Sequence, residues 1–163
     1  MNSSHDSPRP VRPGEYPLWE EALSLVGRDL DALLPGRGPL RLLALPSWDE
    51  EEAEDGPGHE HVYVALPDGR WHGDHLWHGS ASDPDTALAE VAEAAQETVL
   101  ECLWQVWPVC GEHGLGMHAG QEDGRAVWRC AGGVAPGGPA HVRAAVGELD
   151  APHRPRRARR KLR

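Results

Sequence analysis

The sequence predicts an α+β fold in which two helices pack against a small antiparallel sheet and a C-terminal hairpin follows. Two long segments repeat apolar residues at the three- and four-residue steps of a helix. Shorter segments alternate apolar and polar residues, as strands do, and end at proline, glycine or aspartate. The chain has 163 residues, which is the length of about one domain.

We expect a single domain over residues 15–149, with residues 107–149 as a subregion built like a zinc ribbon. Residues 1–14 mix proline, serine, arginine and histidine without periodicity, and residues 150–163 are rich in arginine. Both end segments are therefore expected to be disordered.

The predicted location is the cytoplasm. Residues 1–14 contain no apolar stretch typical of a secretory signal, and no apolar run approaches the roughly 18 residues that a membrane span needs. Three cysteines are too few, and odd in number, for a disulfide framework. In a reducing compartment these thiols stay available to bind metal.

The first helix is predicted within "YPLWEEALSLVGRDLDALLPG", residues 16–36. Pro17 suits the first helical turn, and Pro35 with Gly36 ends the pattern. The apolar stripe consists of Trp19, Leu23, Val26, Leu30 and Leu33. One such stripe predicts one buried face.

Two strand regions are expected after this helix. Residues 39–46, "PLRLLALP", form a short apolar run closed by proline, and the acidic stretch at 49–58 reads as a solvated loop. Residues 61–78, "HVYVALPDGRWHGDHLWH", then predict a hairpin whose turn is Asp68-Gly69.

The second helix is predicted over residues 82–108. Ser82 or Asp83 can cap it, Pro84 lies in its first turn, and Asp85 completes a capping-box pattern. Pro108 is expected to stop it. The buried stripe is expected to contain Leu88, Val91, Ala95, Val99, Cys102, Leu103 and Val106.

The last third of the domain predicts three strands. Residues 114–130 read as a hairpin with its turn near Asp123-Gly124, and residues 141–149 offer a further strand. Because the chain has no phenylalanine, most tryptophans are expected in the core. These are Trp71, Trp77, Trp104, Trp107 and Trp128.

A Cys-x2-His pair, Cys110 and His113, follows the second helix. Two intervening residues let both side chains converge on one ion, and zinc binds four cysteine or histidine ligands in a tetrahedron. Cys130 and His141 complete the pattern C-x2-H-x16-C-x10-H. His118 is the alternative fourth ligand, and buried free thiols are the alternative to a structural zinc site.

The same region resembles the C-terminal portion of small uncharacterised proteins from GC-rich bacteria. The shared features are a W-P-x-C-x-x-H start and a V-W-x-C strand, matched here by Trp107, Pro108, Cys110, His113, Val127, Trp128 and Cys130. The resemblance spans residues 107–149 and implies no activity. The glycine-rich insertion at 131–141 departs from the tighter turn expected before His141.

A second histidine cluster lies in "WHGDHLWH", residues 71–78. His72, His75 and His78 follow at three-residue intervals, with Asp74 among them, and on a helix the three imidazoles would share one face. On the predicted strand His72 and His78 share a face, and His75 points to the opposite one. Solvent-facing polar residues are therefore the ordinary interpretation. A metal-dependent hydrolase that uses these residues is kept as an alternative.

Charge is distributed unevenly. The last ten residues carry seven basic groups, Arg154, Arg156, Arg157, Arg159, Arg160, Lys161 and Arg163. Residues 1–153 then hold nine basic and 26 acidic groups, a net charge of −17. Such a tail can bind nucleic acid by releasing counterions, which makes a nucleic-acid-associated factor an alternative function.

Motifs for catalysis are lacking: the sequence contains neither a G-x-S-x-G elbow nor a P-loop. We therefore expect a non-enzymatic cytosolic protein-interaction or adaptor module, stabilised by a structural zinc when the four ligands assemble. Its partner is expected to be a protein.

Overall fold

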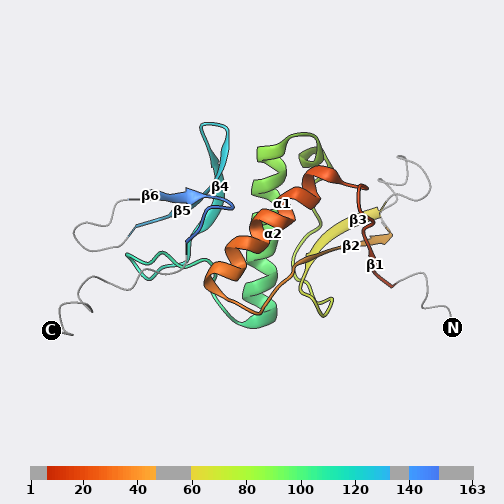
Figure 1. The fold of residues 1–163 in the computed structure, drawn as a ribbon, viewed down its shortest axis with the longest axis horizontal. Helices are drawn as coiled ribbons and strands as arrows, with labels where there is room; N and C mark the ends of the chain where they lie inside the picture. The colour runs from red at the N-terminus through yellow and green to blue at the C-terminus, as the bar shows by residue number, and fades with distance from the viewer. Residues whose placement is uncertain (1–6, 47–59, 133–139, 151–163) are drawn as a thin grey trace.

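The computed structural model describes residues 7–46, 60–132 and 140–150. Two helices lie side by side in the middle of the molecule, and a three-stranded antiparallel sheet flanks them on either side (Figure 1). The architecture is α+β, as the sequence predicts. The acidic loop expected at 49–58 and the basic tail 154–163 lie outside the described residues.

Helix α1 (Pro17–Leu33) begins with proline in its first turn. The Glu20 carboxylate accepts hydrogen bonds from the backbone N–H groups of Gly14 and Tyr16, which closes the N-terminal end. Its buried face comprises Trp19, Ala22, Val26, Asp29 and Leu30. The predicted stripe is thus largely confirmed, but it contains a carboxylate that the apolar pattern did not reveal.

Helix α2 (Pro84–Leu103) is capped by Asp83, whose carboxylate accepts the N–H of Thr86. The helix ends at Leu103 because Trp104 adopts a left-handed conformation with φ 53°. The expected end at Pro108 is therefore wrong, and Val106 lies beyond the helix.

The first sheet contains β1 (Arg9–Pro10), β2 (Arg41–Pro46) and β3 (Glu60–Ala65), in that order. Strands β2 and β3 confirm two of the predicted strands. Strand β1 falls in the segment that was expected to lack structure, and it pairs with β2 at the edge of the sheet.

The predicted hairpin over residues 61–78 forms its turn but not its return strand. The Leu66 N–H donates to the Arg70 carbonyl across the turn, and the next backbone hydrogen bond to β3 is the one from the Leu76 N–H to the Val62 carbonyl. Gly73 adopts a left-handed conformation with φ 96°, which interrupts extended backbone between these two points. A loop and a short 3-10 helix (His78–Ser82) take the place of the strand.

The second sheet contains β4 (His118–Glu122), β5 (Arg125–Cys130) and β6 (His141–Ala145). Asp123 and Gly124 join β4 to β5 with positive φ values of 52° and 77°. This is the backbone of a two-residue type I′ turn, whose twist matches the strands it connects. The predicted hairpin is confirmed, and the further strand predicted at 141–149 forms but ends at Ala145.

Tryptophan packing agrees with the sequence only in part. Trp19, Trp107 and Trp128 are buried, and the rings of Trp107 and Trp128 meet edge to face with centroids 5.4 Å apart. Trp77 and Trp104 are 62% and 88% exposed, so their expected core positions are wrong. Both stand where the backbone leaves regular structure, Trp104 at a helix end and Trp77 before the 3-10 helix.

Asp29 is fully buried on α1 and connects that helix to the second sheet. Its Oδ2 accepts hydrogen bonds from Trp128 Nε1 at 2.7 Å and from the Gly147 N–H at 2.6 Å, while its Oδ1 accepts the Leu149 N–H at 3.0 Å. Burial raises the pKa of this carboxyl, and the three N–H donors oppose that rise.

Replacing the buried Asp29 should lower the free energy of unfolding more than replacing an exposed aspartate on the same helix. Asp29→Ala leaves three buried N–H donors without an acceptor, and we expect it to lower the free energy of unfolding by about 3 kcal/mol or more. Asp29→Asn should be intermediate, because one carboxylate oxygen becomes an N–H donor facing another donor. Urea denaturation measures both, with the exposed Asp31→Asn on the same helix as control. Equal stability of the Asp29 and Asp31 variants would contradict this account.

Candidate metal centre

Cys110 and His113 lie in the segment between α2 and β4, which we call the ligand loop (residues 104–117). The N–H of Cys110 donates to the Leu115 carbonyl, and the Gly114 N–H donates back to the Cys110 carbonyl, both at 2.8 Å. A bridge between Val109 and Gly116 closes the base of this turn. The turn therefore holds both predicted ligands on one side.

Cys130 and His141 meet through strand pairing. Cys130 is the last residue of β5, His141 is the first residue of β6, and the two are direct partners in the antiparallel register. Directly opposed residues of such a pair extend to the same face of the sheet. The long spacing between them in the sequence is therefore no obstacle, because the sheet and not a tight turn brings them together.

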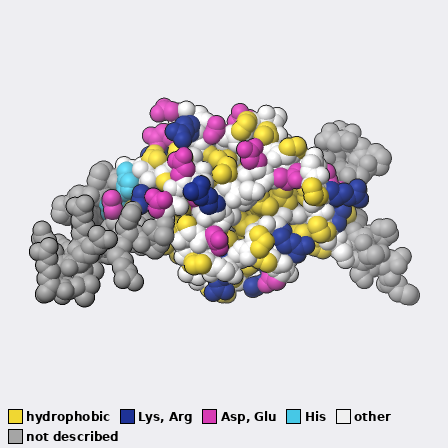
Figure 2. All heavy atoms as spheres, in the orientation of Figure 1, with side chains coloured by type: hydrophobic (Ala, Val, Ile, Leu, Met, Phe, Trp, Pro, Cys, Tyr) yellow, Lys and Arg dark blue, Asp and Glu magenta, His cyan; other side chains and the backbone are white. Residues whose placement is uncertain are grey.

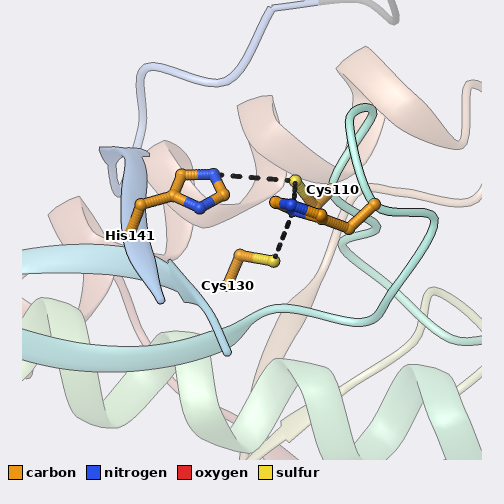
Figure 3. Close-up of side chains that lie close together, drawn as sticks. Cys110, Cys130 and His141 are labelled. Carbon is orange, nitrogen blue, oxygen red and sulfur yellow. Dashed lines mark hydrogen bonds between the residues drawn. The ribbon is translucent and has the colours of Figure 1, made fainter. Parts of the chain in front are cut away.

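The four donor atoms converge on one point. All lie within 4.8 Å of one another, and Figure 3 shows the side chains of Cys110, Cys130 and His141 turned toward each other. His113 Nδ1 is 3.6 Å from the sulfur of Cys110 and 3.4 Å from that of Cys130. The Cys110 sulfur is also 3.8 Å from His141 Nε2. Sulfur and nitrogen bound to one tetrahedral zinc would be about 3.6 Å apart, given bonds of about 2.3 and 2.0–2.1 Å.

The cluster is enclosed on its sulfur side. Cys110 and Cys130 are fully buried, whereas His113 and His141 are half-buried. Histidine side chains reach the surface at the end of the molecule that the second sheet occupies (Figure 2). The Gly132 N–H donates a hydrogen bond to the Cys130 sulfur at 3.4 Å. Two thiolates and two imidazoles in this arrangement could hold one metal ion.

The other predicted ligands lie elsewhere. His118, the alternative fourth ligand, is exposed at the start of β4 opposite Arg129 and does not belong to the cluster. His72 lies 3.4 Å from a Glu97 oxygen, and His75 stacks on His61 with ring centroids 3.6 Å apart. Within the part of the chain that the structure describes, Cys110, His113, Cys130 and His141 form the one group spaced to hold a metal ion.

Gln96 is a site residue that sequence reasoning missed. From α2, its Nε2 donates to the carbonyls of Trp107 and Met117, and its Oε1 accepts the Ala119 N–H. One side chain therefore fastens the ligand loop near its start and at its end. A glutamine within a helix is ordinary in sequence, and nothing in its local pattern marks it.

Known protein families, curated proteins and solved structures contain no match to this chain. The helices in the described ranges are all too short or too polar to cross a lipid bilayer. The site is therefore defined by its geometry, as a Cys2His2 cluster between a turn and the paired ends of two strands. The resemblance to the W-P-x-C-x-x-H proteins stays a prediction.

Removing the Gln96 side chain should loosen the ligand loop. Gln96→Ala deprives two carbonyls and one N–H of their partner, and we expect a loss of about 1–3 kcal/mol in the free energy of unfolding. Gln121→Ala is a matched control, since that exposed amide makes a single hydrogen bond to Thr86 and its loss should cost under about 0.5 kcal/mol. Urea denaturation distinguishes the two, and equal losses would argue against the fastening role.

Proposed function

We propose that Cys110, His113, Cys130 and His141 bind one Zn²⁺, and that the protein is a non-enzymatic interaction module whose C-terminal region this ion stabilises. The observation that carries the proposal is the convergence of four donor atoms within 4.8 Å. They come from a turn and from two paired strands, and they match the set that the sequence spacing predicts.

Zinc fits this donor set better than other common ions. Thiolate and imidazole are its usual protein ligands, and a tetrahedron suits it because it has no competing geometric preference. Magnesium, calcium and manganese favour oxygen ligands. A reducing, cytoplasmic setting, as the sequence predicts, would keep both thiols available.

The ion's role would be structural. Four protein ligands fill a tetrahedral ion and leave no position for water or substrate, whereas catalytic zinc sites keep one position open. The ligands join the ligand loop to β5 and β6, so that binding the ion adds a cross-link between segments that are distant in the sequence. Binding free energy at such a site contributes directly to folding.

The alternative functions receive less support. Binding of nucleic acid would depend on residues 154–163, which lie outside the described residues. A hydrolase would need His72 and His75 at one ion, but these side chains contact Glu97 and His61 respectively. An interaction module is favoured because apolar side chains stay exposed at the end of α2 and beyond it, among them Leu100, Trp104 and Val106.

Metal content tests the ligand set. Protein purified without a histidine tag should contain one zinc per chain by elemental analysis, and Cys110→Ser or His141→Ala should reduce that content by about tenfold or more at equal free zinc. Two matched controls are Cys102→Ser, since Cys102 lies on α2 away from the cluster, and His118→Ala. Both controls should keep the full zinc content.

The same measurement can reject the proposal. Wild-type protein that binds no zinc after refolding with the ion, and whose three thiols all react freely with a thiol reagent, would contradict it. Loss of zinc in His118→Ala but not in His141→Ala would reassign the fourth ligand.

Zinc removal should also lower thermal stability. At free zinc about 1,000 times Kd, binding stabilises the folded state by about 4 kcal/mol, which corresponds to roughly 10 °C in Tm for a chain of this size. A chelator should therefore lower the Tm of wild type and of Cys102→Ser, but leave that of Cys110→Ser unchanged. A chelator that shifts all three equally would point to an effect unrelated to the site.

A further inference from the structure

A groove of about 270 Å³ lies between the second half of α2 and the ligand loop. Four of its lining side chains are apolar: Leu100, Val106, Trp107 and Met117. Trp107 and Met117 are buried and form its floor, while Leu100 and Val106 are 43% and 54% exposed. Apolar side chains that gather in one exposed groove are typical of surfaces where another molecule binds.

The rim of the groove is acidic. Glu93, Glu97 and Glu101 line it from α2, and their four-residue spacing places one carboxylate on each successive turn of the same helix face. His118 lines it from β4, and the described residues of the lining include neither lysine nor arginine. Glu97 also contacts His72, yet both side chains remain 51% exposed.

An exposed tryptophan extends the apolar surface. Trp104 follows Leu100 by one turn at the end of α2 and is 88% exposed. Tryptophan is enriched among the side chains that dominate binding energy at protein interfaces, and burying one removes a large apolar area from water.

We propose that this groove docks a cationic segment of a partner polypeptide, which places an apolar side chain against Leu100 and Val106 and pairs arginine or lysine with the three glutamates. We choose a cationic partner on charge complementarity, because the acidic rim of the groove repels anions. The rest of the chain is also acidic: residues 1–153 carry a net charge of −17. Carboxylates are spread over much of the face shown in Figure 2. The inference rests on the proposed interaction function, which it deepens by naming the surface and the chemistry of the partner.

The groove and the metal cluster share a wall. Val106, Trp107 and Met117 belong to the ligand loop that carries Cys110 and His113, and the same Gln96 amide fastens that loop to α2. Cross-linking the loop to β5 and β6 would therefore limit the motion of one side of the groove. A preformed groove loses less conformational entropy when a partner binds.

The test uses the full-length protein, with its zinc content measured, and a 12-residue peptide that alternates arginine and leucine. Titration of ¹⁵N-labelled protein should shift the amide signals of residues 93–101, 104–107 and 117–118. Replacing the leucines of the peptide with serine should weaken binding about tenfold, and a peptide with glutamate in place of arginine should not bind. Shifts confined to other surfaces would overturn the proposal.

Matched charge variants separate docking from general attraction. The triple variant Glu93→Gln, Glu97→Gln, Glu101→Gln should raise the Kd about tenfold, whereas Glu21→Gln, Asp31→Asn, Glu148→Gln removes the same charge from exposed sites outside the groove and should change it less than about threefold. Equal weakening in the two triple variants would also overturn the proposal. Leu100→Ser should weaken the arginine–leucine peptide but not the arginine–serine peptide.

Two further measurements identify other occupants. Replacing the seven basic residues after residue 153 with glutamine leaves peptide affinity unchanged if the groove awaits a separate partner. A tenfold gain in peptide affinity would show that the chain's own tail fills the groove. A dimer of the wild-type protein that the triple glutamate variant dissociates would show that a second copy fills it. Each of these results overturns the proposal. Failure of the zinc proposal can be told apart from failure of this one. Protein that takes up no zinc when the ion is supplied, yet still binds the peptide in the groove, would contradict only the zinc proposal.

Discussion

The antiparallel pairing of β5 with β6 is the constraint on which the candidate metal centre depends. It places Cys130 opposite His141, and these two residues then need only the Cys110 turn to complete a four-donor cluster. Strand pairing positions side chains through many backbone hydrogen bonds, so the geometry of this half of the site does not rely on the chain that connects the strands. The turn supplies the other half through its own short-range hydrogen bonds.

Two polar side chains from the helices hold this C-terminal assembly in place. Asp29 on α1 accepts hydrogen bonds from Trp128 and from the backbone after β6, and Gln96 on α2 binds the backbone on both sides of the Cys110 turn. The helix pair thus supports the cluster, and α2 also forms one wall of the acidic groove. A ligand loop anchored in this way would couple binding of the proposed zinc ion to the shape of the groove.

Sequence patterns predicted what is local or periodic. Apolar spacing located both helices, the Asp123-Gly124 turn located a hairpin, and ligand spacing selected the four residues that the structure brings together. The prediction of a return strand after Asp68-Gly69 was wrong, because turn residues indicate that the chain reverses but not whether the following segment pairs as a strand. Asp29 and Gln96 were missed since their partners lie far along the chain, and Trp104 was misplaced because a left-handed helix end depends on tertiary context.

Cys110 and His113 are close in the sequence, whereas Cys130 and His141 come together only when β5 and β6 pair. This difference sets the order in which the two pairs can assemble. A turn as short as that from Cys110 to His113 closes in well under a microsecond, while hairpin pairing takes about 1–10 microseconds. On a nascent chain, Cys110 and His113 would therefore be able to bind an ion before β6 pairs with β5. Cys130 and His141 would complete the coordination of that ion afterwards. The ion would then direct the pairing of β6 during folding, and would not only stabilise the protein after it has folded.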